Sequence, residues 1–184
     1  LLLGILVLVN WSCEKDEVRA IAGDGIGSTV SASATTVDMS LENASQPAIT
    51  FNWTPADFGY QAAISNTLQL GVKGDNFTTV KEVAMPAGAV SAAYTQQDFN
   101  VAVLGLNIPT GVATVIEARI KSSIGNEIAP VYSNVIDLTV TPYASTSYLY
   151  VPGAYQGWDP ATAESLISPN SNGIYEGVIL FTEN

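Results

Sequence analysis

Short segments in which apolar and polar residues alternate recur along residues 35–142, with turn-forming residues between them. The segment 48–54 (AITFNWT), for example, places Ile49, Phe51 and Trp53 on one face, and the segment 113–123 (ATVIEARIKSS) alternates in the same way. A period of two residues is that of a β-strand with one buried face. About seven such segments in roughly 100 residues are typical of an antiparallel β-sandwich. We therefore predict an all-β fold for this part of the chain.

One segment, 96–104, breaks the strand period. Thr95 stands where its side chain can cap the first turn of a helix, and Asp98 occupies the third helical position. Gly105 follows as a residue typical of the end of a helix. We predict a short helix over 96–104 that crosses from one sheet of the sandwich to the other.

Three side chains of the predicted sandwich admit both a structural and a ligand-binding role. Trp53 lies in the inward phase of an early strand, where a tryptophan is usually the core aromatic of a sandwich. Arg119 and Lys121 share the polar phase of the segment 113–123. We therefore expect Trp53 in the core, and Arg119 and Lys121 on the solvated face of their strand rather than in an anion site.

The composition excludes several classes of function. Charged residues make up 12% of the 184 residues, and the net charge is −11, which disfavours binding to the phosphates of nucleic acid. The chain has no histidine, which removes histidine-based acid–base chemistry, the Ser-His-Asp triad and most zinc sites. A single cysteine leaves no internal disulfide, so packing must stabilise the fold. We expect no cofactor and no metal.

The single cysteine, Cys13, lies between an apolar run over 1–9 and the charged cluster EKDE over 14–17. Nine apolar residues suit the core of a signal peptide and fall well short of the roughly 20 that a membrane-spanning helix needs. We interpret 1–12 as the remnant of a signal peptide, Cys13 as a lipidated residue and 13–34, rich in glycine and serine, as a flexible tether. The alternatives are an ordinary secretory signal with an incidental cysteine and a buried strand that carries a free thiol.

A second unit begins after a linker over 143–147. Residues 148–151 and 174–181 have strand character, and a loop rich in glycine and proline between them carries Tyr155 and Trp158 (AYQGWDP). Roughly 40 residues are too few to close a β core alone, so we expect 148–184 to be the truncated start of a further β domain. An aromatic ring on such a loop can stack on a sugar, although the residue alone favours Trp158 as a core side chain of its own domain. We interpret 169–173 (PNSNG) as a turn rather than a calcium site.

The order of these motifs resembles that of the SusE/SusF family of starch-binding outer-membrane lipoproteins of Bacteroidetes. The resemblance covers about residues 10 to 184. It is carried by the following segments: Cys13 with EKDE, ITFNWTPA, YTQQDFNVAVLGL, IEARIKSS, YSNVIDLTVTPY and LYVPGAYQGWDPATAESLISPNSNGIYEGVILF.

The resemblance implies an Ig-like or fibronectin type III-like spacer over 35–142 that does not itself bind starch, followed by a starch-binding module over 148–184. It further implies a non-catalytic lipoprotein that faces the cell exterior. Such a protein would hold starch or malto-oligosaccharides near a TonB-dependent transporter and other surface glycan-binding lipoproteins. Trp158 and, less directly, Tyr155 are the sugar-binding residues that the resemblance carries onto this chain.

Two other functions stay open on the sequence. The chain is either a structural spacer or adhesin, or the accessory N-terminal part of a surface glycosidase. A glycosidase needs two carboxylates about 5–10 Å apart in a cleft, and none of the segments with acidic residues presents a recognisable pair.

Overall fold

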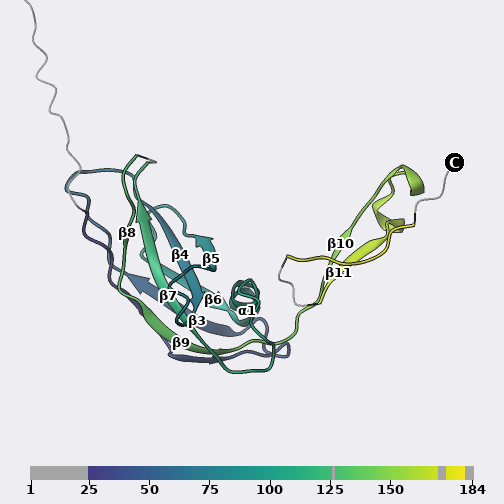
Figure 1. The fold of residues 1–184 in the computed structure, drawn as a ribbon, viewed down its shortest axis with the longest axis horizontal. Coiled ribbons are helices and arrows are strands. Elements are labelled where there is room, and N and C mark those ends of the chain that lie inside the picture. The colour runs from purple at the N-terminus through teal and green to yellow at the C-terminus, as the bar shows by residue number, and fades with distance from the viewer. Residues whose placement is uncertain (1–24, 126, 170–172, 181–184) are drawn as a thin grey trace, which may run out of the picture.

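The computed structural model describes residues 25–125, 127–169 and 173–180, and it forms a β-sandwich followed by a separate hairpin (Figure 1). Cys13 and the predicted signal-peptide remnant lie outside the described residues. One sheet has three antiparallel strands in the order β1-β3-β6. Their bounds are β1 (Val30–Ala32), β3 (Pro47–Trp53) and β6 (Ser91–Thr95).

The second sheet follows the order β2-β9-β7-β4-β5, with β8 also paired to β7. Its strands are β2 (Thr36–Asp38), β4 (Ser65–Val72), β5 (Val80–Ala84), β7 (Thr114–Ser123), β8 (Val131–Tyr132) and β9 (Ile136–Thr141). All pairings are antiparallel except that of β2 with β9, which is parallel. In a constant-type immunoglobulin sandwich, strands A, B, E and D form one sheet and strands C, F and G form the other. Here β1, β3 and β6 take the places of A, B and E, and β4, β7 and β9 take those of C, F and G. The strand order here has that arrangement, so the predicted all-β, Ig-like or fibronectin type III-like fold is confirmed.

The core lies between the two sheets and is built by the alternation seen in the sequence. On β3, Ile49, Phe51 and Trp53 are buried, while the residues between them are more exposed. The expected core position of Trp53 is therefore confirmed. On β7, the buried side chains include Ile116 and Ile120, which face the same core. Burial of these apolar faces is the main driving force for such a fold.

Helix α1 (Gln96–Leu104) begins directly after β6 of the first sheet and leads to β7 of the second, as predicted. The hydroxyl of Thr95 accepts a hydrogen bond of 3.1 Å from the backbone N–H of Asp98, which caps the helix. Phe99 of the helix enters the core, where its ring packs against those of Phe51 and Tyr94. The helix therefore closes one edge of the sandwich and does not only connect the sheets.

Gly105 follows the helix but does not have the backbone conformation expected of a glycine stop. Its φ of −62° is right-handed, so it does not provide the left-handed stop typical of glycine. A side chain at Gly105 would instead place its Cβ 2.9 Å from Cδ of Lys81. The left-handed residue is Asn107, with a φ of 56°, two positions later. That contact is with the far end of a flexible side chain, so the space around Gly105 is only moderately restricted.

The last part of the predicted tether, 13–34, lies within the sandwich. Ile26 pairs with Asp57, and Val30 is bonded through its N–H and C=O to the side chain of Asn134. A Cβ on Gly27 would lie only 1.9 Å from the carbonyl oxygen of Tyr132. The small residues that suggested flexibility therefore allow close packing instead, and the structured domain starts before residue 35.

A hairpin follows the sandwich. It consists of β10 (Ser147–Tyr150) and β11 (Ser165–Ser168), joined by a loop with the 3-10 helices η1 (Ala154–Gln156) and η2 (Pro160–Thr162). The predicted strand over 148–151 is present one residue earlier, and β11 was not predicted. Over the described part of 174–181, the expected strand is reduced to one bridge between Glu176 and Ile167.

Among the described residues, no helix has the length and apolar character needed to cross a membrane.

Candidate functional site

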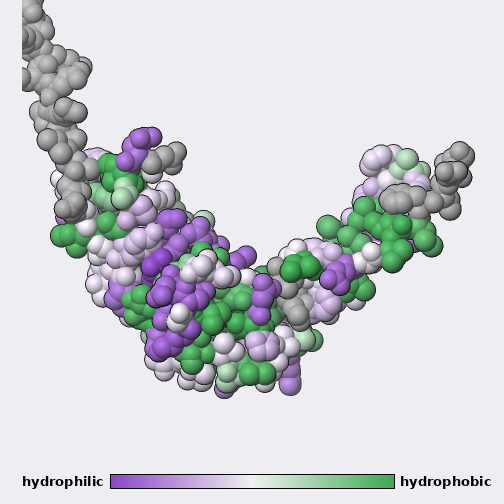
Figure 2. Space-filling model, in the orientation of Figure 1, coloured by the Kyte–Doolittle hydropathy of each residue, from purple (hydrophilic) through white to green (hydrophobic). Residues whose placement is uncertain are grey.

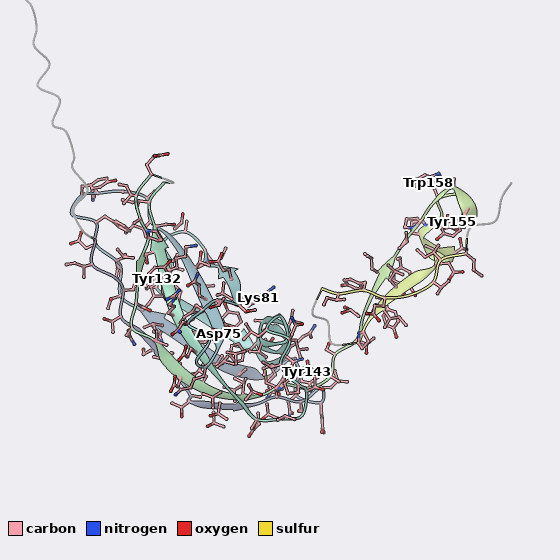
Figure 3. The ribbon with its side chains drawn as sticks, viewed as in Figure 1. Asp75, Lys81, Tyr132, Tyr143, Tyr155 and Trp158 are labelled. Atoms are coloured by element: carbon pink, nitrogen blue, oxygen red, sulfur yellow. The ribbon has the colours of Figure 1, made fainter. Side chains whose placement is uncertain are left out.

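The loop between β10 and β11 carries both predicted sugar-binding residues at the far end of the hairpin (Figure 3). Gly157 and Trp158 have left-handed backbones, with φ of 74° and 62°. The N–H of Trp158 donates a 2.9 Å hydrogen bond to the carbonyl of Gly153, which closes the turn. Left-handed backbone is uncommon outside glycine. This turn therefore fixes the direction in which the indole of Trp158 leaves the loop.

Polar side chains hold the loop from within. The amide of Gln156 accepts a 3.0 Å bond from the N–H of Asp159 and donates a 2.6 Å bond to its carbonyl. The carboxylate of Asp159 accepts from the N–H of Ala161 and caps η2. These bonds keep the segment on both sides of Trp158 in one conformation.

Tyr155 and Trp158 have different environments. The half-buried Tyr155 donates its hydroxyl hydrogen to the carbonyl of Val151, and its ring lies against Gly153, where an added Cβ would be 2.8 Å away. The side chain of Trp158 is 69% exposed. The structure thus brings both residues onto one loop, with Tyr155 as part of the loop's framework and Trp158 as an open aromatic surface.

A second group of polar and aromatic side chains lies on the outer face of the six-stranded sheet. We call Gln69, Phe77, Arg119 and Tyr132 the outer-face cluster. Cζ of Arg119 lies 3.9 Å from the ring centre of Phe77 and 4.1 Å from that of Tyr132. Nε of Arg119 donates a 2.7 Å hydrogen bond to Oε1 of Gln69. Figure 2 shows hydrophilic atoms gathered over this part of the sandwich.

Both Arg119 and Lys121 were expected on the solvated face of their strand. That expectation changes for Arg119 and stays nearly as it was for Lys121. Arg119 is half-buried and flanked by two rings, whereas Lys121 forms an ion pair of 3.2 Å with Glu82. The pKa of Glu82 is lowered, first by the hydrogen bond from Gln69 and then by the bond from Lys121. The alternation of β7 predicted the face but gave no signal for Phe77, which reaches Arg119 from the β4–β5 turn.

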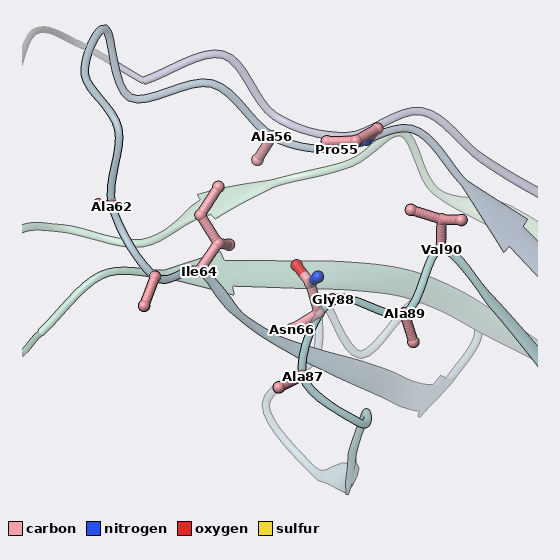
Figure 4. Close-up of a pocket in the computed structure, with 10 residues that line it drawn as sticks. Pro55, Ala56, Ala62, Ile64, Asn66, Ala87, Gly88, Ala89 and Val90 are labelled. Carbon is pink, nitrogen blue, oxygen red and sulfur yellow. The ribbon is translucent and has the colours of Figure 1, made fainter.

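Two pockets of the sandwich differ in their linings, one being mainly apolar and the other containing charged and polar side chains. One, of about 340 Å³, lies beside the turns over 55–64 and 87–90 and is lined by small apolar residues and Asn66 (Figure 4). The amide oxygen of Asn66 already accepts a 2.7 Å hydrogen bond from Ser122. Another, of about 450 Å³, lies between β5 and α1, where burial and then Asp98 raise the pKa of Tyr94. Among the described residues, no group of three acidic or cysteine side chains is placed to hold a metal ion.

The chain was compared with known proteins. The sequence profile of a family described as "SusE outer membrane protein" matches residues 15–121, which is more than half of the chain. A comparison with curated proteins gave no match. Among solved structures, the chain is similar to one described as "Crystal structure of chicken CNTN1 FN1-FN3 domains". The TM-score is 0.34 and the identity 11%, over 84% of this chain and 52% of that chain, so this chain spans about half of that structure.

Proposed function

The chain belongs to the SusE outer membrane protein family, and on that premise we propose that it is a non-catalytic surface lipoprotein that binds starch or malto-oligosaccharides. Membership of the family supports a place in polysaccharide utilisation at the outer membrane. The proposed protein holds its glycan close to an outer-membrane uptake system. Its partners there are a TonB-dependent transporter and other surface glycan-binding lipoproteins.

The observation that carries the proposal is the exposed indole of Trp158 on a loop whose conformation is fixed. A flat aromatic surface of this kind favours the C–H faces of a pyranose, and it needs no charge on the ligand. Tyr155 supports the platform by fastening the loop to Val151. We propose that 148–184 belongs to a carbohydrate-binding module, and that the sandwich before it is a spacer.

The test is retention of the full-length protein on insoluble starch, compared between the unchanged protein, Trp158→Ala and Tyr150→Ala. Tyr150 is the matched control because it is an aromatic residue of the same hairpin with a similar exposure. Loss of the stacking surface in Trp158→Ala is expected to weaken retention about tenfold or more, with an unchanged melting temperature. Tyr150→Ala is expected to bind starch normally.

The outcomes separate the alternatives. Absence of retention by the unchanged, folded protein contradicts the starch assignment and favours a structural spacer or adhesin. Release of soluble sugar during the incubation contradicts the non-catalytic assignment and favours part of a glycosidase. A lower melting temperature of Trp158→Ala indicates that the indole is a core residue of its domain.

We also propose lipidation at Cys13, which the position between an apolar run and an acidic cluster supports. Several acyl chains on one residue give stable anchoring, whereas a single chain does not. In cells that express the full-length protein, Cys13→Ala is expected to move the protein from the membrane fraction to the soluble fraction. Mass spectrometry of the membrane-bound protein should find the acylated cysteine at the mature N-terminus.

A further inference from the structure

We propose that the outer-face cluster is a second ligand site, in which Arg119 binds the carboxylate of an acidic sugar. The site lies on the sandwich and is separate from the loop of Trp158. That the ligand is a sugar rests on the proposed function, whereas the carboxylate is inferred from the cluster itself.

The guanidinium of Arg119 has hydrogen-bond donors left over. Its Nε–H is taken by Gln69, and no other described residue accepts from its remaining N–H groups. Among the described residues, the one buried side-chain nitrogen or oxygen without a partner is Nε1 of Trp53. The other nitrogens of Arg119 are therefore at least partly accessible to solvent. Two parallel N–H donors on a planar guanidinium match the two oxygens of a carboxylate.

The guanidinium is also held in place before any ligand arrives. The rings of Phe77 and Tyr132 flank it at 3.9 Å and 4.1 Å, and Gln69 fixes one edge. Gln69 is itself 5% exposed, and its amide N–H donates a 2.7 Å bond to Glu82. A long side chain that is already ordered loses little conformational freedom on binding, which favours affinity.

The turn that brings Phe77 to Arg119 adopts an unfavourable backbone. Asn76 and Phe77 are both left-handed, with φ of 54° and 57°. The carboxylate of Asp75 stabilises this turn by accepting from the N–H of Phe77 at 2.8 Å. Gly71 leaves room for the ring, since an added Cβ would lie 3.2 Å from it. Strained backbone of this kind concentrates at ligand sites, where the surrounding structure sustains it.

Among the described residues, no carboxylate forms an ion pair with the guanidinium of Arg119. Among the described residues, the two ion pairs are Lys73–Asp137 and Lys121–Glu82, both on the outer face of the sheet. Glu117, two residues before Arg119 on the same face, acts on Lys73, whose pKa is raised mainly by Asp137 and to a smaller extent by Glu117. Arg119 is thus a cation without a carboxylate partner in the described part of the chain.

The size of the cluster favours a sugar over a protein partner. Its open part is one guanidinium edge beside Tyr132, a side chain that is 42% exposed. A stable protein interface needs about 800 Å² on each partner and a packed apolar centre. The outer-face positions of β7 and β9 are instead mostly polar or charged, and they include Lys121 and Thr139. A single acidic pyranose fits this chemistry, with its carboxylate on Arg119 and its ring beside Tyr132.

The test is titration of the ¹⁵N-labelled whole chain with glucuronate, followed by the amide shifts of residues 69, 77, 119 and 132. Glucose, acetate and a short glutamate peptide are titrated in parallel. Saturable shifts with glucuronate and none with glucose are expected. Arg119→Gln is expected to weaken glucuronate binding about tenfold or more, and Arg119→Lys, which keeps the charge but not the fork, to weaken it nearly as much.

Lys121→Gln is the control for charge, because it removes one positive charge from the same face and changes no member of the cluster, although Lys121 and Gln69 share Glu82 as a partner. It is expected to change the affinity less than about threefold, as befits a screened surface charge. Equal weakening by Lys121→Gln and Arg119→Gln overturns the proposal in favour of non-specific attraction. Tighter binding of acetate or of the peptide than of glucuronate overturns the assignment to a sugar.

The proposed starch binding and the proposed second site can be contradicted independently of each other. Trp158→Ala in the same titration should leave glucuronate binding unchanged, and Arg119→Lys should leave retention on starch unchanged. Loss of starch binding alone therefore contradicts the proposed function, while absence of glucuronate shifts in a protein that binds starch contradicts the second site. Circular dichroism of each variant shows that it is folded.

Discussion

The sandwich buries its large aromatic and apolar side chains, whereas the hairpin leaves them exposed. In the sandwich, Phe51, Phe99 and Leu70 are fully buried within a core that includes both sheets and α1. In the hairpin, Tyr150 and Trp158 are more than half exposed, and no large side chain is fully buried among its described residues. The sandwich is therefore the main source of stability in the described chain. A two-stranded hairpin alone is marginally stable in water, which sharpens this contrast.

The most severe test of this contrast is a pair of truncations, one in each region. Phe51→Ala removes a ring that contacts both Tyr94 and Phe99, and it is expected to lower the free energy of unfolding by about 3–5 kcal/mol. Tyr150→Ala, in the hairpin, is expected to change it by less than about 0.5 kcal/mol. Urea denaturation followed by circular dichroism measures both. A comparable loss from both variants would show that hairpin and sandwich share one core.

A second test concerns the point where the chain leaves the sandwich. The buried amide of Asn100 donates to the carbonyl of Tyr143 at 3.0 Å and accepts from its N–H at 2.9 Å. Asn100→Ala leaves both backbone groups without their partner and is expected to cost about 2–3 kcal/mol. Asn43→Ala, at an exposed turn, is the control and should cost far less. A negligible effect of Asn100→Ala in the same denaturation would mean that these hydrogen bonds do not hold the chain at Tyr143 to the sandwich.

A third test asks where the sandwich begins. Gly27→Ala places a methyl group against the carbonyl of Tyr132, and relief of the clash requires movement of backbone. We expect a loss of about 1–3 kcal/mol, whereas Gly88→Ser at an open turn tests the cost of a left-handed glycine without a clash. Thermal melts of the two variants separate these causes. If Gly27→Ala melts like the unchanged protein, residues before β1 behave as tether after all.

The smallest expected effect is a dependence of stability on pH through Glu82. Its folded pKa lies below the ordinary value of 4.5, so its contribution is present above pH 4.5 and is lost as the pH falls through the folded pKa. Glu82→Gln should therefore lower the melting temperature slightly at pH 7 and by less near pH 3. An equal shift at both pH values would assign the effect of the substitution to packing rather than to charge.

The fold was predictable from the sequence where a local pattern, such as strand alternation or a helix cap, coincides with the residues that form the core. Alternation on β3 predicted the buried face that includes Trp53, and Thr95 with Asp98 predicted the helix at its observed bounds. Both signals are local, because a strand face and a helix cap involve residues close in the chain. The strand β11 was missed because SLIS is short and lies next to turn residues, so pairing with β10 rather than its own period defines it.

The sites depended on contacts that span the chain. The loop GAYQGW suggested both Tyr155 and Trp158, but only the hydrogen bond of Tyr155 to Val151 distinguishes framework from platform. The outer-face cluster joins Phe77, Arg119 and Tyr132, which come from the β4–β5 turn, β7 and β8. No spacing in the sequence encodes such a meeting, since it depends on strand order and on a strained turn. The tether was similarly misplaced, because glycine signals flexibility and close packing alike.

The parallel pairing of β2 with β9 has a mechanical consequence. These strands lie near the two ends of the sandwich in sequence, and Thr36–Asp38 runs beside Thr139–Thr141 with further backbone bonds at either end of the pair. When a pull between the N-terminal and C-terminal sides reaches β2 and β9, it is directed along both strands in opposite senses. The interstrand bonds then carry the load together, in shear, instead of opening one after another. A protein tethered at one end and gripping a polymer at the other would resist stretching at this seam.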